Sequence, residues 1–311
     1  MLTFLARRLL GAVPIIFGVA LIVFLLFNVV GGDPALMMLG KHATVQQIAD
    51  VQHEYGLDRP LPVQFGKYLI EIVTFDFGRS YATRQEISEM IFRGVGPSLS
   101  LAVPAFTLST LIAIVISLFV AYFRGTWIDR FSVVLCVIGM SVPSLGYILF
   151  GQYILAYQFS FFPISGYDYS FFGRMEYLAL PMLIWIALSV GYDVRFYRTA
   201  LIEEISNDYV RTARAKGLPE PRVFFKHVLK NSMVPIITNL ILEIPLLILG
   251  SVLLESFFGI PGLGTITLDA LHNSDFPVLK AMTTITSLLL IFGNIVVDVI
   301  YTLVDPRMKL T

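Results

Sequence analysis

The sequence predicts an all-α polytopic membrane protein with six transmembrane helices. Hydrophobic residues make up 56% of the 311 and charged residues only 14%, whereas about a quarter of a soluble domain is charged. Several apolar runs also reach the roughly 20 residues that a helix needs to cross a bilayer. These two observations make the lipid bilayer an expected partner. The 22 basic and 22 acidic side chains cancel, so we expect no nucleic-acid partner.

Six apolar runs are the candidate spans. The first follows Arg7 and Arg8, but it is too long for the apolar part of a signal peptide and lacks a cleavage site. Prolines such as Pro143 and Pro245 lie inside the runs and are expected to kink the helices, which packed membrane helices tolerate. The predicted spans are Leu9–Val30, Pro97–Phe123, Phe131–Tyr157, Tyr177–Val194, Met233–Phe257 and Ala281–Val304.

The distribution of Lys and Arg predicts the orientation. With the N-terminus inside, 14 of the 22 cations fall on short cytoplasmic segments and the other 8 are spread over longer external ones. Cytoplasmic loops of membrane proteins hold an excess of Lys and Arg. Both termini are therefore expected in the cytoplasm.

The spans divide the chain into four parts. They are a tail and first helix at 1–30, an external segment at 31–94, a transmembrane domain at 95–305 containing a cytoplasmic loop at 200–232, and a tail at 306–311. In the external segment, apolar residues recur at helical spacing on both sides of "GLDRPLP". This pattern predicts short amphipathic helices interrupted at that stretch.

Catalytic and metal-binding motifs are absent from the sequence. The single cysteine, Cys136, excludes an internal disulfide, and the four histidines lack metal-ligand spacing. No phosphate-binding G-x-x-x-x-G-K-[ST] motif occurs. We therefore expect no metal, no bound cofactor and no enzymatic activity in this chain, and any ATP must be hydrolysed elsewhere.

The cytoplasmic loop contains "SNDYVRTARAKGLPEP", which predicts two short helices joined by a sharp turn. Ser206, Asn207 or Asp208 can cap the first helix. Gly217 and the prolines of "GLPEP" end it, and Pro221 suits the first turn of the next.

Two interpretations of the cations in the first helix remain open. Arg211 and Arg214 share a face, while Ala213 and Gly217 are four residues apart and could form a strip where another backbone approaches closely. The helix would then be a docking element. Alternatively, the cations only enforce the positive-inside orientation.

Ionisable residues at membrane depth suggest a functional site. Glu243 lies in the fifth span, one turn after Asn239, and could line a pathway and meet the amino group of a peptide. The alternative is a helix contact with no substrate role, because polar side chains often join membrane helices. We expect structural roles for Glu255 and Asp298, and we expect Asp193 to mark the cytoplasmic end of span four.

Several motifs in order resemble the permeases of ABC importers for dipeptides and oligopeptides. "DYVRTARAKGL" followed by "HVLKNSMVP" resembles their cytoplasmic EAA loop. "GGDPALMMLG", "YGLDRPLPVQF", "FDFGRS", "ESFFGIPGLGTITLDAL" and "DVIYTLVDPRMK" extend the resemblance over nearly the whole chain. The sequence departs from the general EAA pattern at Arg211 and Thr212, a form that the peptide-type branch shares and that narrows the family. It departs from the family at Phe75, Gly96 and Ser98, which weakens the prediction of a substrate.

The resemblance implies a type I ABC importer permease in a bacterial or archaeal cytoplasmic membrane. It implies a second homologous permease, two ATPase subunits that bind ATP and magnesium, and an external solute-binding protein that delivers substrate. The 200–232 loop would contain the coupling helix that docks on the ATPase. The residues carried over to this role are Asp208, Tyr209, Arg211, Thr212, Ala213, Arg214, Lys216, Gly217 and Leu218.

The predicted substrate is a di- or oligopeptide. Nickel, glutathione and other small solutes are alternatives within the same class of permease. Two alternatives lie outside that class: a secondary transporter coupled to ions through Glu243 or Asp298, and a membrane scaffold without transport activity. The sequence shows no clear internal repeat of the kind that secondary transporters contain.

Overall fold

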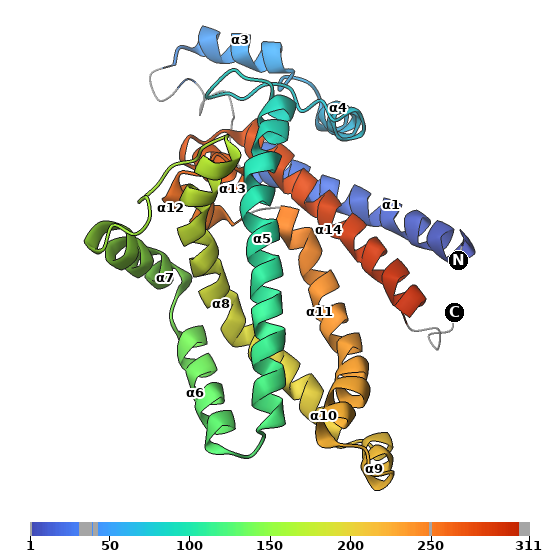
Figure 1. The fold of residues 1–311 in the computed structure, drawn as a ribbon. Coiled ribbons are helices and arrows are strands. Elements are labelled where there is room, and N and C mark those ends of the chain that lie inside the picture. Colours follow the sequence, from blue (N-terminus) through green and yellow to red (C-terminus); the bar gives the residue numbers. More distant parts are fainter. Residues whose placement is uncertain (1, 31–38, 40–42, 249–250, 305–311) are drawn as a thin grey trace. The chain divides into compact units, whose positions relative to one another are not determined.

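The computed structural model describes residues 2–30, 39, 43–248 and 251–304. The tail at 306–311 and the side chains of Asp298 and Pro245 lie outside the described part. Helices form nearly all of that part (Figure 1). The chain divides into two compact units, Met1–Ser98 with Pro261–Thr311, and Leu99–Ile260.

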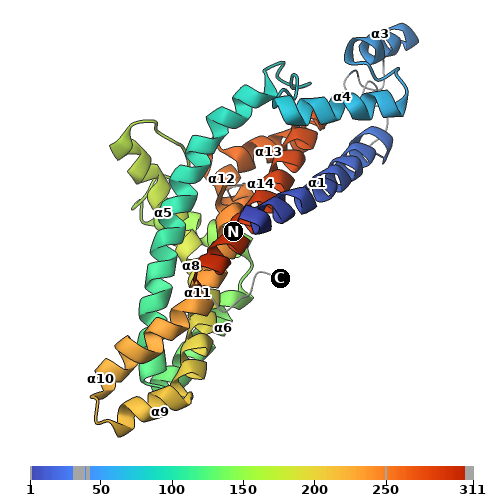
Figure 2. The same ribbon diagram turned by 90° about the vertical axis from the view of Figure 1, so that its right-hand side faces the viewer.

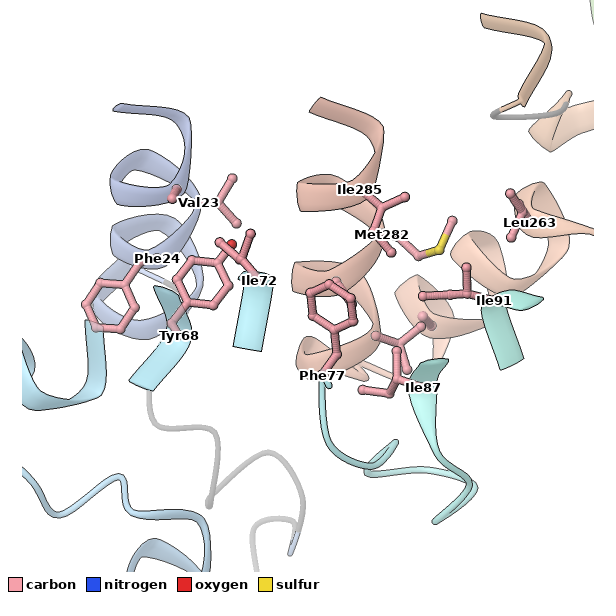
Figure 3. Packing of buried hydrophobic residues seen from close by; sticks show 14 residues of the cluster. Val23, Phe24, Tyr68, Ile72, Phe77, Ile87, Ile91, Leu263, Met282 and Ile285 are labelled. Atoms are coloured by element: carbon pink, nitrogen blue, oxygen red, sulfur yellow. The ribbon is translucent and has the colours of Figure 1, made fainter. Parts of the chain in front are cut away.

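The first unit contains the N-terminal and C-terminal helices. Helix α1 packs alongside α14, as both views show (Figures 1 and 2). Tyr68 and Ile72 of α4 and the side chains of Phe24, Met282 and Ile285 join one buried cluster (Figure 3). Its helices are α1 (Leu2–Leu25) with the π-helical turn η1 (Leu26–Val30), α3 (Val45–Tyr55), α4 (Leu61–Thr74), the start of α5 (Ile87–Tyr122), α13 (Leu263–His272) and α14 (Phe276–Val304).

The two amphipathic helices predicted for the external segment are present. Thr44 caps α3 by accepting a hydrogen bond from the Gln47 backbone N–H, and the Gln47 side chain returns the contact. Gly56 ends α3 in the left-handed conformation, with φ of 70°, which a glycine adopts without steric cost. Helix α4 begins only after Pro60. The interruption therefore falls at "GLDRPLP", as predicted.

The second unit is built around the long helix α8, against which α6, α7 and α11 pack. Three buried clusters fill the spaces between these helices and α5. The elements that follow α5 in this unit are α6 (Trp127–Ser141), α7 (Ser144–Gly151), η2 (Gln152–Gln158), α8 (Phe171–Ile205), α9 (Asp208–Ala215), α10 (Glu220–Val223), η3 (Phe224–Val228), α11 (Leu229–Ile248) and α12 (Val252–Phe258).

The predicted third span is not one continuous helix. Helix α6 ends at Ser141, and the segment Ser144–Gln158 leaves it at an angle of 89°. Val142 is extended, with ψ of 125°, because the ring of Pro143 disfavours helical backbone in the residue before it. Pro143 also lacks the N–H that would continue the helix. The expected kink is thus a break.

The predicted fifth span is also divided. Helix α11 ends at Ile248 and α12 starts at Val252, where the Ser251 side chain accepts a hydrogen bond from the Leu254 backbone N–H. A serine hydroxyl that caps a helix favours a new start over continuation. A second sharp bend, of 84°, separates α12 from α13.

By length and composition, four helices of the described chain could cross a membrane, or up to six if each bent pair counts as one span. These are Arg7–Val29, Ile87–Tyr122, Phe171–Ile205 and Phe276–Val296, with the pairs α6 to η2 and α12 to α13. The upper figure equals the predicted six. Helix α11 borders residues 249–250, which lie outside the described part, and is not among these segments.

Candidate functional site: the cytoplasmic loop and the polar pair in α11

Helix α9 lies at the end of the second unit opposite α12 (Figures 1 and 2). It begins after Asn207, whose backbone is extended and whose carbonyl accepts from the Val210 N–H at 3.1 Å. The expected side-chain cap is not formed at this position. The Asn207 side-chain amide donates to Glu204 at 2.8 Å instead.

Tyr209 ties α9 back to the end of α8. Its hydroxyl donates to the Glu204 carboxylate. Burial raises the pKa of Tyr209 above its ordinary value, and the hydrogen bond to Glu204 raises it further. The phenol is therefore protonated at neutral pH and keeps donating.

The apolar side of α9 packs on its own chain. Val210 is fully buried and Ala213 is 5% exposed, and both join a cluster with Leu201 of α8, Phe224 and Val228. The small side chain of Ala213 lets α9 lie close to these residues. The buried side chains of α9 thus pack against those of α8 and of the turn that leads into α11.

The opposite side of α9 is exposed. Arg211 has a side chain that is 75% exposed, next to Asp208, which is 95% exposed. The Thr212 hydroxyl donates to the Asp208 carbonyl at 2.9 Å. Lys216 is also exposed. The outward face therefore combines one acidic and two basic groups with a short polar side chain.

The predicted strip of Ala213 and Gly217 does not exist as a surface. Ala213 faces the inside of the unit, whereas Gly217 is exposed at the end of the helix with φ of 74°. A Cβ at Gly217 would meet nothing within 4 Å. The four-residue spacing fails because the helix ends at Ala215 and the backbone becomes left-handed at Gly217.

An ion pair closes the turn that follows α9. Arg214 Nε donates to Glu220 Oε2 at 3.1 Å, and Arg214 Nη2 donates to Glu220 Oε1 at 2.5 Å. These hydrogen bonds lower the pKa of Glu220 below its ordinary value and raise that of Arg214. Leu218 packs on the buried cluster between them. The sequence reasoning did not include Glu220, although a carboxylate six residues after an arginine across a Gly–Pro turn could have suggested the pair.

The polar pair predicted in α11 is present. Asn239 Nδ2 donates to Glu243 Oε1 at 2.8 Å. Asp193 and Tyr197 of the adjoining helix α8 are 4% and 0% exposed. Helix α8 continues past Asp193 to Ile205, and the membrane boundary expected at Asp193 stays a prediction.

A buried ion pair between α6 and α8 was not foreseen. Arg198 Nε and Nη2 donate to the Asp129 carboxylate at 2.6 and 2.8 Å, and the Gly125 backbone N–H donates to the same group at 2.9 Å. Sequence reasoning counted Arg198 only as a cytoplasmic cation. A partner 69 residues away leaves no local signal.

Helix α9 is thus a charged helix that packs against the end of the long helix α8. Comparison with known proteins identifies the class of protein. The chain belongs to the family of binding-protein-dependent transport system inner membrane components: residues 113–310 match that family, and residues 1–102 match its N-terminal region.

Named relatives align over the whole chain. The glutathione transport system permease protein of Salmonella paratyphi A is 35% identical over 309 residues, 99% of each chain. A Brucella abortus protein, whose name assigns it provisionally to peptide transport, is 33% identical over 313 residues, again 99% of each. The protein is therefore the permease subunit of an ABC importer, a multi-pass protein of the cytoplasmic membrane that works with an ATPase and a substrate-binding protein, and it is not an enzyme.

Proposed function

We propose that this permease carries small peptides across the membrane, paired with a second homologous permease and driven by two ATPase subunits that dock on α9. The relatives support a peptide substrate, because their names assign them to glutathione or to peptides, and glutathione is itself a small peptide. ATP and magnesium would bind to the ATPase subunits, because this sequence has no phosphate-binding loop.

The observation that carries the docking role is the division of α9 into two faces. Val210 and Ala213 are fixed in the packing of the unit, while Asp208, Arg211 and Lys216 are exposed. Charged groups on a rigid support provide complementarity to a partner without costly ordering on binding. Positive-inside orientation alone would not require a helix that is packed on one side.

The same packing gives α9 a way to transmit movement. Its buried side chains contact Leu201 of α8 and Val228 just before α11. Tightly packed side chains transmit displacement because they leave few voids to absorb it. A shift of α9 on the ATPase would therefore move α8 and α11 together, and with them Glu243.

Glu243 is the candidate group for meeting the amino group of a peptide, with Asn239 holding its carboxylate. The bond to Asn239 equally suits a structural helix contact. The two roles differ in whether the charge of Glu243 matters to transport.

Transport by the reconstituted complex tests the substrate. The permease, its partner permease, the ATPases and the binding protein would be placed in liposomes and supplied with a labelled dipeptide, glutathione or nickel ions. ATP-dependent uptake of either peptide is expected. Uptake of nickel without uptake of peptides would refute the peptide assignment.

A charge reversal tests the docking role separately. Arg211→Glu is expected to reduce substrate-stimulated ATP hydrolysis at least tenfold, because an exposed cation becomes an anion on the docking face. Arg59→Glu makes the same charge change in the external segment and should leave hydrolysis unaltered. Equal activity of both variants would contradict docking through α9.

A further inference from the structure

A cavity of about 280 Å³ lies within the first unit. It is lined by α4, by the stretch Phe77–Tyr81 and by the start of α14. Three cations line it, Lys67, Arg79 and Lys280, against one carboxylate, Glu71. The cavity therefore favours an anion.

Lys280 is held in place but keeps hydrogen-bonding capacity. Its side chain is 19% exposed, and its ammonium lies 4.3 Å from the centre of the Tyr68 ring, on the face that attracts cations. The nearest oxygen of Glu71 is 3.7 Å away, beyond the length of an ordinary hydrogen bond. The ammonium has three donors, so it can still serve a ligand in the cavity.

The other two cations are weakly paired or unpaired. Arg79 lies 3.7 Å from Glu86, and both side chains are 66% exposed, so this surface pair contributes little. Among the described residues, no carboxylate lies within 4.0 Å of the Lys67 ammonium. Neither cation is held strongly by a carboxylate, so both can pair with an incoming anion.

The cavity lies where two apolar helices end. Phe27 and Asn28 belong to the turn that ends the run of α1, and Phe276 and Pro277 begin α14. Both helices are long and apolar enough to cross a bilayer. The point where such helices leave the hydrocarbon is the level of the lipid headgroups.

Helix α4 adds an exposed apolar stripe beside the cavity. Val63 and Ile70 are exposed, and they lie four and three residues from Lys67, which places all three on the same side of the helix. Apolar residues flanking a lysine on one helix are typical of helices that lie in the membrane surface.

We propose that this cavity binds the phosphate of an anionic phospholipid, with an acyl chain alongside Val63 and Ile70. The phosphate oxygens accept hydrogen bonds from Lys67, Arg79 and Lys280. A small free anion would satisfy the cations but would leave the apolar stripe uncovered, which is why the lipid is favoured. The proposal does not depend on the transported substrate.

Lipid retention by the purified transporter complex tests the proposal. The complex would be exchanged into equal amounts of phosphatidylglycerol and phosphatidylcholine, and bound lipid counted by native mass spectrometry. Preferential retention of phosphatidylglycerol is expected. Lys67→Ala with Arg79→Ala should lower it by roughly 25-fold, since each surface cation contributes about fivefold. Lys67→Arg keeps the charge and should retain the lipid.

Arg93→Ala is the matched control, because Arg93 is an exposed cation that pairs with Glu89 on α5 and does not line the cavity. Its lipid retention should equal that of the wild type. Three results would each overturn the proposal: equal retention of the two lipids by the wild type, unchanged retention in the double variant, or displacement of phosphatidylglycerol by millimolar inorganic phosphate or glutathione. The last would show a site for small soluble anions.

Discussion

The guanidinium of Arg214 and the carboxylate of Glu220 meet across the turn that ends α9, through two hydrogen bonds of 3.1 and 2.5 Å. This contact fixes the helix that we propose as the docking element against the start of the next helix. Weakening this ion pair should therefore change both the thermal stability of the protein and the coupling of ATP hydrolysis to substrate.

Glu220→Gln should remove the negative charge of the Arg214–Glu220 ion pair, which we call the clamp. It should lower the melting temperature by at most about 2 °C at pH 7, because a partly exposed ion pair contributes about 1 kcal/mol or less. Substrate-stimulated ATP hydrolysis should fall more than stability does, since the turn positions α9. Glu203→Gln, which removes an exposed carboxylate of α8 outside the docking face, controls for simple loss of charge. Unchanged coupling in Glu220→Gln would show that the clamp does not position α9.

The same clamp predicts a pH dependence. The pKa of Glu220 is lower in the folded protein than its ordinary value of about 4.3. Its stabilisation is therefore complete above the unfolded pKa and is lost as pH falls through the lower folded pKa. Thermal unfolding of the wild type and Glu220→Gln should differ at pH 6 to 7, and the difference should shrink as pH falls below about 4.3 towards the folded pKa. A constant difference down to pH 3 would contradict this.

Removing Arg198 should destabilise the protein by about 3 kcal/mol, because it leaves the buried Asp129 carboxylate without its cation. Thermal or denaturant unfolding of Arg198→Ala measures the loss. The double change Arg198→Met with Asp129→Leu should recover most of it, and Arg130→Ala, at an exposed neighbour, should have little effect. A double variant as unstable as the single one would show that the loss comes from packing instead.

Replacing Gly217 by Trp should abolish substrate-stimulated hydrolysis while the protein still inserts into the membrane, because a bulky group would project at the docking face. The left-handed backbone also costs a non-glycine residue about 1–2 kcal/mol. Gly217→Asn separates the two effects, since asparagine tolerates this conformation and is small. Normal hydrolysis in Gly217→Trp would rule out docking at this end of α9.

Glu243→Gln keeps an oxygen for the Asn239 hydrogen bond and removes only the charge. If Glu243 meets the amino group of the substrate, the KM for a peptide with a free amino terminus should rise about tenfold, while uptake of an N-acetylated peptide should not change. An equal KM in the variant and the wild type would favour the structural role.

The elements that local chemistry specifies were predictable from sequence. The capping pattern at Thr44 and the glycine at position 56 delimit α3 in the structure, and Gly217 with the following prolines separates α9 from α10. Each of these signals acts within a few residues. Hydropathy also identified the long helices α1, α5, α8 and α14.

Features that depend on tertiary contacts were not predictable. Hydropathy cannot distinguish a kink from the 89° break at Pro143, because both keep the same apolar composition. The inward position of Ala213 depends on Leu201 and Phe224, and the pairing of Arg198 depends on Asp129 in another helix. Helical spacing shows which residues share a face of a helix, but not whether that face points into the protein or outward.

The burial of Val210 and Ala213 determines which substitutions in α9 such a permease can accept as it evolves. The side of α9 that holds it to the chain is separate from the side that is free to meet a motor protein. Substitutions at Arg211 or Lys216 can therefore accumulate in step with changes in an ATPase without unfolding the helix. Those at Val210 or Ala213 are constrained whichever ATPase the permease uses.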